Sequence, residues 1–205
     1  MNEFPKSFLK LVEAIRNCEY CRGTLPLGPN PVLRVGVEKA PILIVGQAPG
    51  LRVHQTKLPW NDPSGDKLRQ WLGVSREQFY DTRYFTIIPA GFCYPGRNER
   101  GGDLPPRQEC RKLWWDKILE YTIDFKLILL MGEYAQKIFL GERIKSSLRD
   151  TVFSWREYYP PYLPCPHPSF RNNLWLKRNP WFLEEVVPFV RTVTHRLINE
   201  VEAKK

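Results

Sequence analysis

The stretch Pro41-Ile-Leu-Ile-Val-Gly-Gln-Ala-Pro-Gly50 decides the fold of this chain. Its four consecutive aliphatic residues, 42–45, stop abruptly at a turn. This pattern predicts a short buried strand, because a helix would need a longer segment with a polar stripe. In an open α/β sheet, ligands bind beyond the carboxyl ends of the strands. We therefore expect the turn to form the floor of a ligand site, where Gly46 and Gly50 let a ligand approach the main chain.

Length and composition indicate a single globular domain over residues 1–205, with 42% hydrophobic and 26% charged residues. No apolar stretch reaches membrane-spanning length, and the first six residues lack the apolar core of a signal peptide, so we expect a cytoplasmic protein, without membrane contact and monomeric. The 31 Lys and Arg residues outnumber the 22 Asp and Glu residues, which gives a net charge of +9. This excess favours a polyanionic partner, although a basic, solvated surface would give the same count.

Four of the five cysteines form a pattern that is typical of a metal site. Cys18 and Cys21 make a CxxC pair, and Cys93 and Cys110 flank a loop rich in Gly, Pro and Arg. Cytosolic thiols stay reduced, so a disulfide framework is not expected. Four thiolates could close around zinc or an iron-sulfur cluster, although a zinc ribbon would show a second tight pair. The spacing alone leaves four unrelated thiols equally open, and Cys165 is expected to be a small buried side chain.

The rest of the chain alternates between helical and extended patterns. Apolar spacing and cap signals predict helices over residues 5–17, 64–72, 106–121, 133–140 and 180–201. Apolar runs bounded by turn residues predict strands over residues 42–45, 84–88 and 126–131, and a fourth strand that ends at residue 163. Ser64 is the expected N-cap of the second helix, residues 51–63 should form a long loop, and Pro188 should bend or break the last helix. The alternation predicts a three-layer α/β/α sandwich around a short, mainly parallel sheet of about four strands.

Two motifs then resemble a known family. Gly46-Gln-Ala-Pro-Gly50 and His167-Pro-Ser169 are similar, in order and separation, to the signature motifs of the uracil-DNA glycosylase superfamily. The resemblance spans residues 15–182 and is greatest to the iron-sulfur (family 4) type, which has Glu where Gln47 stands. It implies a [4Fe-4S] cluster bound by the four cysteines at the matching places, with zinc or no metal as alternatives. It also implies hydrolysis of the N-glycosidic bond of uracil or another deaminated base in DNA.

The resemblance assigns catalytic roles to single residues. An enzyme that acts on a DNA base must extrude the base, hold its face and read its edge. His167 would stabilise the negative charge that develops on the departing base. Trp60 stands where the family carries its stacking aromatic residue, and Gln47 would orient water. Asp62 is the nearest carboxylate that could activate water, with a turn or cap role as the alternative.

Further positions are expected to contact DNA. Backbone phosphates would lie at Gly turns and helix starts, as at Gly50, Ser64 and Ser169. The segment 170–175 stands where the family carries a wedge that fills the vacated base stack, and Leu174 or Trp175 is the candidate. A set of basic residues flanks this wedge: Arg171, Lys177 and Arg178.

Two departures from the family concern the base pocket. Ala48 stands where the best-known relatives carry a catalytic Asp, and Pro89 stands where the family has a base-reading Asn. Both positions are still expected to line the base site. A protein of the same fold that binds nucleic acid or a damaged base without cleaving it is the alternative function. A redox enzyme using the CxxC is disfavoured, because no compact thioredoxin-like unit surrounds Cys18.

Overall fold

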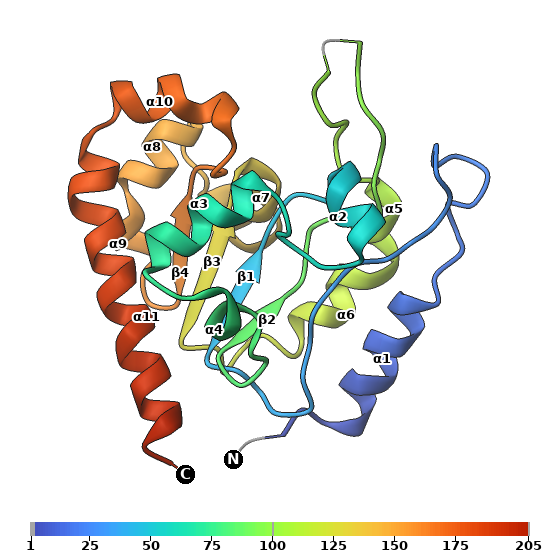
Figure 1. Ribbon diagram of the computed structural model, residues 1–205, viewed down its shortest axis with the longest axis horizontal. Coiled ribbons are helices and arrows are strands. Elements are labelled where there is room, and N and C mark those ends of the chain that lie inside the picture. Colours follow the sequence, from blue (N-terminus) through green and yellow to red (C-terminus); the bar gives the residue numbers. More distant parts are fainter. Residues whose placement is uncertain (1–2, 100, 205) are drawn as a thin grey trace.

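Four parallel strands form the centre of the protein in the computed structural model, which describes residues 3–99 and 101–204. The strands are β1 (Ile42–Val45), β2 (Phe85–Ile87), β3 (Leu127–Met131) and β4 (Tyr162–Cys165), in the order β2-β1-β3-β4. All three strand pairs are parallel. The predicted parallel sheet of an α/β/α fold is therefore confirmed (Figure 1).

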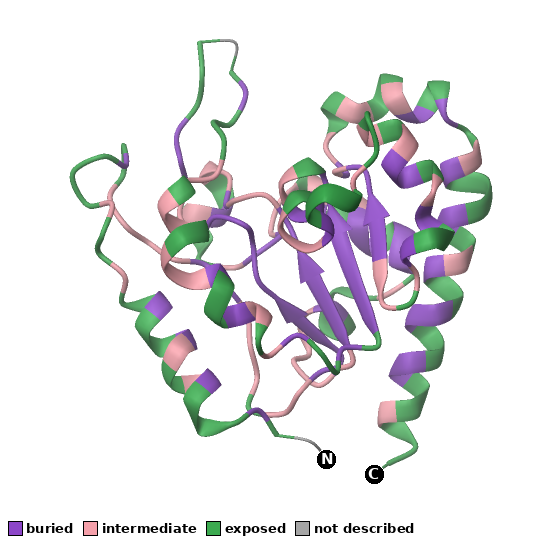
Figure 2. Cartoon of the chain, turned by 180° about the vertical axis from the view of Figure 1, so that it is seen from behind, coloured by how far each residue is buried: buried purple, intermediate pink, exposed green. Residues whose placement is uncertain are grey.

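Alternate residues of each strand enter two separate cores. In β1, Ile42 and Ile44 pack into the core beneath the helices at 63–72 and 187–202, whereas Leu43 and Val45 pack into the core beneath those at 6–16, 116–119 and 133–140. Successive side chains of a strand point to opposite faces, and a sheet covered on both faces has apolar residues at every position. This explains why all four residues of β1 are buried, and Figure 2 shows the buried sheet between exposed helical surfaces.

Helices cover both faces of the sheet. Their bounds, in chain order, are α1 Lys6–Arg16, α2 Leu51–Thr56, α3 Pro63–Leu72, α4 Arg76–Tyr80, α5 Gln108–Cys110, η1 Arg111–Trp115, α6 Asp116–Leu119, α7 Glu133–Leu140, η2 Gly141–Arg143, α8 Leu148–Phe153, α9 Trp155–Tyr158, η3 Phe170–Asn172, α10 Asn173–Arg178, η4 Phe182–Val186 and α11 Val187–Glu202. None of the helices in the described ranges is long and apolar enough to cross a membrane.

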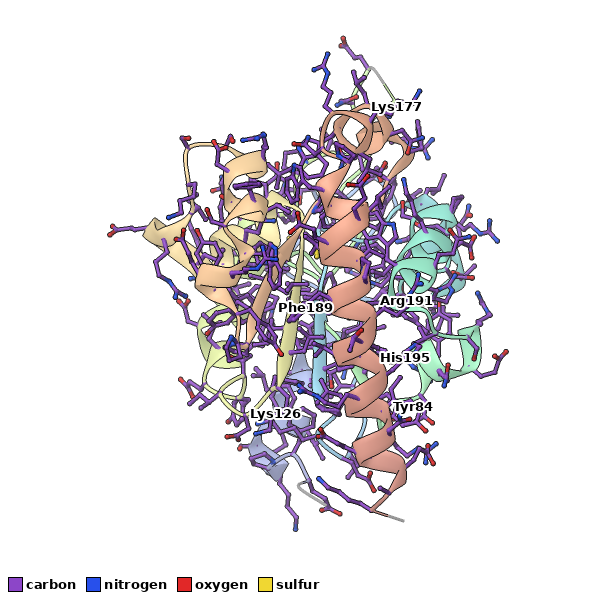
Figure 3. The ribbon with its side chains drawn as sticks, turned by 90° about the vertical axis from the view of Figure 1, so that its left-hand side faces the viewer. Tyr84, Lys126, Lys177, Phe189, Arg191 and His195 are labelled. Atoms are coloured by element: carbon purple, nitrogen blue, oxygen red, sulfur yellow. The ribbon has the colours of Figure 1, made fainter. Side chains whose placement is uncertain are left out.

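The long C-terminal helix α11 holds one helical layer together. Arg191 Nη2 donates a hydrogen bond to the Gln70 carbonyl at 2.8 Å, and His195 Nε2 lies 2.8 Å from the Gly73 carbonyl oxygen at the end of α3. Phe189 points to the other side of α11, toward α9 (Figure 3). These contacts fix α3, whose first turn builds part of the site, against the sheet.

Two local predictions near the first motif are wrong. Residues 51–56 form helix α2 rather than a loop; this helix buries only Val53, so the sequence carries no apolar stripe that would signal it. Ser64 is not a helix cap. The N-cap of helix α3 lies two residues earlier, at Asp62, which accepts a hydrogen bond from the Gly65 amide at 2.8 Å.

The predicted helices at 106–121 and 180–201 are each interrupted. The first begins at Gln108 and passes through the π-helical turn η1 before α6. The second contains a π-helical turn, η4, and Pro188 lies in the first turn of α11, where a missing amide hydrogen costs little. The fourth strand also extends past residue 163 to Cys165. Four short helices, α4, α8, α9 and α10, were not predicted.

Candidate functional site

The site lies at the carboxyl edge of the sheet, where the turns after β1 and β2 run side by side. The Ala90 amide donates to the Gly46 carbonyl at 2.9 Å, and the Gly91 amide donates to the Gln47 carbonyl at 2.8 Å. These bonds continue the ladder between β1 and β2 beyond the strands and bring buried Pro89 next to the first motif. Neither Pro89 nor Ala48 adds a polar side chain to this edge.

Trp60 and His167 stack on each other above this edge. Their ring centroids are 5.3 Å apart, with an interplanar angle of 26°. The Trp60 ring also lies against Gly46, where an added Cβ would stand only 2.8 Å from Trp60 Cζ2. The structure therefore brings together the first motif, the aromatic residue before α3 and the histidine after β4, as the sequence predicted.

The Trp60 backbone is strained and held from several sides. Its φ of +57° lies in the left-handed region, which bulky residues rarely adopt and which costs about 1–3 kcal/mol. Arg69 is buried and donates from Nη1 to the Trp60 carbonyl at 3.2 Å, and the first turn of α3 approaches that carbonyl at Gly65. Strain of this kind is concentrated at functional sites, because the surrounding structure must maintain it.

His167 is a neutral hydrogen-bond donor. The side chain keeps part of its surface accessible, yet the protein around it lowers the pKa of the imidazole by burial to about 4. The Ser169 amide donates to Nδ1 at 3.3 Å, so Nδ1 acts as an acceptor and the proton resides on Nε2. The Asn172 side chain donates to the His167 carbonyl at 2.8 Å and steadies the turn. His167 can therefore donate one hydrogen bond through Nε2 at neutral pH.

Two carboxylates approach this edge. Asp62 uses Oδ1 to cap α3, and burial is the main cause that raises the pKa of its carboxyl group. Asp103 belongs to the loop between the third and fourth cysteines, and its negative charge also raises the pKa of Asp62. Asp103 was not predicted as a site residue. Its position in the loop between Cys93 and Cys110 is the only signal in the sequence that could have indicated it.

The segment after His167 includes α10, which lies near the top of Figure 1. Leu174 of α10 is 57% exposed, whereas the predicted alternative, Trp175, packs on Trp181 with ring centroids 5.9 Å apart. Leu174 is thus the better wedge candidate. Phe170 is 73% exposed and was not predicted.

The predicted phosphate contacts are arranged around the edge. Gly50 is the N-cap of α2, and Ser64 lies in the first turn of α3. Ser169 caps η3 and accepts from the Arg171 amide at 3.3 Å. Three basic side chains on this segment are exposed: Arg171, Lys177 and Arg178.

The four predicted cysteine ligands line one small pocket. All four thiols are free, and the pocket walls are completed by Leu25, Pro29, Pro31, Phe92, Arg107 and Trp114. Burial raises the pKa of the Cys93 thiol to about 12 and that of Cys110 to about 11, and the neighbouring thiols add to both shifts. Backbone amides, from Asn30 to Cys93 and from Phe92 to Cys110, oppose these shifts.

Four thiols are soft donors, of the kind that zinc and iron-sulfur clusters take. Within the described ranges, no three His, Cys, Asp or Glu side chains are grouped so that they could hold one metal ion. The thiols surround a shared pocket instead. Four soft donors with amide hydrogen bonds to sulfur are typical of iron-sulfur ligation. Cys165 is buried in the other core, as predicted.

The fold and the site define a three-layer α/β protein with a ligand site at the carboxyl edge of a parallel sheet. The family model described as the uracil DNA glycosylase superfamily matches residues 33–191. The chain belongs to this superfamily and has a DNA glycosylase fold. The matched range includes both motifs, Cys93 and Cys110, and begins after Cys18 and Cys21.

The close approach of α3 to Trp60 gives a test of the site's framework. A Cβ at residue 65 would stand 1.8 Å from the Trp60 carbonyl oxygen, so we expect Gly65→Ala to lower the free energy of unfolding by about 1–3 kcal/mol or more. Gly23→Ala is the matched control. An added Cβ at residue 23 meets nothing within 4 Å, and the change should stay within about 0.5 kcal/mol. Equal urea midpoints for the two variants would contradict the account.

The protonation of His167 can be measured directly. Its pKa of about 4 lies below the model-peptide value of 6.5, so the unfolded chain takes up this proton first as pH falls. The stability that neutral His167 contributes should be complete above pH 6.5 and be lost as pH falls toward 4. We expect an NMR titration of the imidazole to give a midpoint near 4 and His167→Asn to reduce the acid sensitivity of unfolding. A midpoint near 6.5 would refute the buried, neutral state.

Proposed function

We propose that this protein is a DNA glycosylase that hydrolyses the N-glycosidic bond of uracil or another deaminated base in DNA. The observation that carries the proposal is the neutral donor His167, which stacks on Trp60 at the carboxyl edge of a fold that belongs to the uracil DNA glycosylase superfamily. Base excision requires a flipped base, an aromatic surface and a donor to the leaving group. The site offers the donor, His167, whereas Trp60 is only 8% exposed and its ring packs against Gly46 and His167.

Leaving-group stabilisation is one catalytic contribution of this site. When the bond from C1′ to the base nitrogen breaks, the electron pair departs with the base and places negative charge on its carbonyl oxygens. A neutral imidazole that donates through Nε2 stabilises this anion without transferring its proton. One such donor is typically worth about 3 kcal/mol, or about a hundredfold in rate. Burial keeps His167 in the donor state over the neutral pH range.

Base recognition differs from that of the family's best-known members. Pro89 lies beside Gly46 but has no amide that could read a Watson-Crick edge, and Ala48 supplies no carboxylate. Gln47, which is half-buried in the same turn, is the nearest amide side chain of the first motif. We therefore assign Gln47 to hydrogen bonding with the base or water, and we expect discrimination among deaminated bases to be weaker than with a dedicated asparagine.

DNA would approach over α2, α3 and α10. The N-terminal turns at Gly50, Ser64 and Ser169 supply backbone amides for phosphates, and Arg171 and Arg178 add positive charge. Exposed Leu174 would enter the base stack when the damaged nucleotide leaves it. Phosphate contacts carry no sequence information, so we expect binding to be independent of flanking sequence.

We also propose that Cys18, Cys21, Cys93 and Cys110 hold a [4Fe-4S] cluster. Their shared pocket, their soft donor chemistry and the amides of Asn30 and Phe92 support this assignment. The cluster would act structurally, because it would tie the segment after α1 to the loop that precedes α5. No catalytic step requires it.

Activity is tested with oligonucleotides that carry uracil, hypoxanthine or xanthine, followed by cleavage at abasic sites. We expect base release from at least one strand and a single-turnover rate about a hundredfold lower for His167→Ala. His195→Gln is the control, because its amide can keep the hydrogen bond to the Gly73 carbonyl at the far end of α3, and it should retain the wild-type rate. Binding of a damaged strand without release of any base would contradict the glycosylase and favour a non-catalytic binding protein.

The cluster is tested by analysis of anaerobically purified protein. We expect a brown protein with equal amounts of iron and sulfide, and loss of both in Cys93→Ser and Cys110→Ser. Cys165→Ala should keep the full content, because Cys165 is buried in the core on the other face of the sheet. Stoichiometric zinc, or no metal after reconstitution, would contradict the assignment.

A further inference from the structure

The loop between Cys93 and Cys110 stands above the carboxyl edge of the sheet as a defined hairpin. The Asn98 amide donates to the Gly102 carbonyl at 2.7 Å, and the Gly102 amide donates to the Asn98 side chain at 2.9 Å. The Leu104 amide donates to the Gly96 carbonyl at 2.9 Å. These bonds fix the two arms, residues 96–99 and 101–104, which rise above the carboxyl edge of the sheet in Figure 1.

Both motifs hold this hairpin. Arg171, just after the second motif, donates from Nη2 to the Gly101 carbonyl at 2.8 Å. Gln47 of the first motif makes a long contact, 3.5 Å, from Nε2 to the Leu104 carbonyl. Asp103 lies between these two anchor points in the sequence. The contacts of Arg171 and Gln47 with the neighbouring residues therefore fix the position of the Asp103 backbone.

The Asp103 carboxylate lies at the first motif. Asp103 Oδ2 is 3.3 Å from the position that a Cβ on Gly50 would occupy. The negative charge of Asp103 also raises the pKa of Asp62, which lies near Trp60 in the sequence. The other carboxylate oxygen of Asp103 faces Arg97 Nε at 3.5 Å, which is too long for a strong hydrogen bond, and 43% of the side chain is exposed. The carboxylate is thus close to the site and open to water.

We propose that Asp103 is the catalytic carboxylate that activates the attacking water, in place of the acid missing at Ala48. This inference rests on the proposed glycosylase function. Asp62 is less suited to the task, because its Oδ1 is committed to the cap of α3. Asp103 instead approaches the first-motif turn from a separate loop. A carboxylate from this loop would then take over the water activation that an Asp at position 48 performs in relatives.

The proposed step uses a water molecule, the Asp103 carboxylate and the His167 donor. The water oxygen forms a bond to C1′ as the bond from C1′ to the base nitrogen breaks, and the electron pair leaves with the base. One water proton passes to the Asp103 carboxylate and then to solvent. The base anion, held by the donor Nε2 of His167, takes a proton from solvent after release. General-base help of this kind contributes about 10²–10⁴-fold.

The charged groups around Asp103 affect its role in opposite ways. Arg97 of the other hairpin arm and Arg171 of η3 are positive, and Arg171 Nη1 lies 3.3 Å from the position of an added Cβ on Gly102. Asp62 at the start of α3 is negative. Charges of both signs therefore lie near Asp103.

The test compares Asp103→Asn with Glu99→Gln, which removes a carboxylate from an exposed position of the same hairpin. On the damaged strand that the wild-type protein cleaves, we expect Asp103→Asn to lower the single-turnover rate at least about a hundredfold and leave the dissociation constant unchanged. The Glu99→Gln rate should stay within about twofold, and Asp103→Glu should recover part of the activity. The acidic limb of the pH-rate profile should flatten in Asp103→Asn, which a merely structural loop residue would not cause.

The outcomes of this test distinguish failure of the Asp103 inference from failure of the proposed glycosylase function. A wild-type rate for Asp103→Asn would overturn this inference and leave the glycosylase intact, and so would an acidic limb that disappears only in Asp62→Asn. An equal loss in both hairpin variants would show that the loop acts only through its fold and would also overturn the inference. Absence of base release by the wild-type protein would overturn the proposed function, and the role of Asp103 with it.

Discussion

The ring of Trp60 can lie against His167 only because residue 46 has no side chain. A Cβ there would come within 2.8 Å of the indole, and the first turn of α3 presses on the Trp60 carbonyl from the opposite end. The left-handed backbone of Trp60 is the cost of this arrangement. Arg69, buried within α3 and hydrogen bonded to the same carbonyl, and α11, which clamps α3 from outside, maintain it. The geometry of the site therefore depends on packing that extends through one whole layer of the fold.

The consequence for chemistry is a rigid, neutral donor beside an aromatic surface. A charged imidazole would be stabilised by water, but the enclosed ring remains neutral and the Ser169 amide selects its tautomer. The polar groups usually supplied by the first motif and by the end of the second strand are absent at Ala48 and Pro89. In the proposed glycosylase, catalytic groups would come from loops, and the hairpin before α5 contacts Gln47 of the first motif and Arg171, two residues after the second.

The central fold could be predicted from sequence because the strands are continuous apolar runs and both faces of the sheet are covered. Trp60 and His167 were assigned to one site from the resemblance of the sequence to the family, and the structure stacks their rings. The cap of α3 was misassigned because Asp62 and Ser64 are both good cap residues, and only the backbone shows that Pro63 is already helical. Asp103 could not be found from sequence, because its place at the first motif depends on contacts with residues far away in the chain. The roles of the individual site residues remain predictions.

The central claim is that the Nε2 proton of His167 is directed at the departing base. The most direct measurement is the imidazole ¹⁵N spectrum of the protein with an uncleavable strand that carries a 2′-fluorinated deoxyuridine or deoxyinosine. The account predicts that the Nε2–H resonance of His167 shifts downfield with the damaged strand and stays in place with an undamaged strand of the same sequence. A damaged strand that binds while this resonance remains unchanged would contradict it.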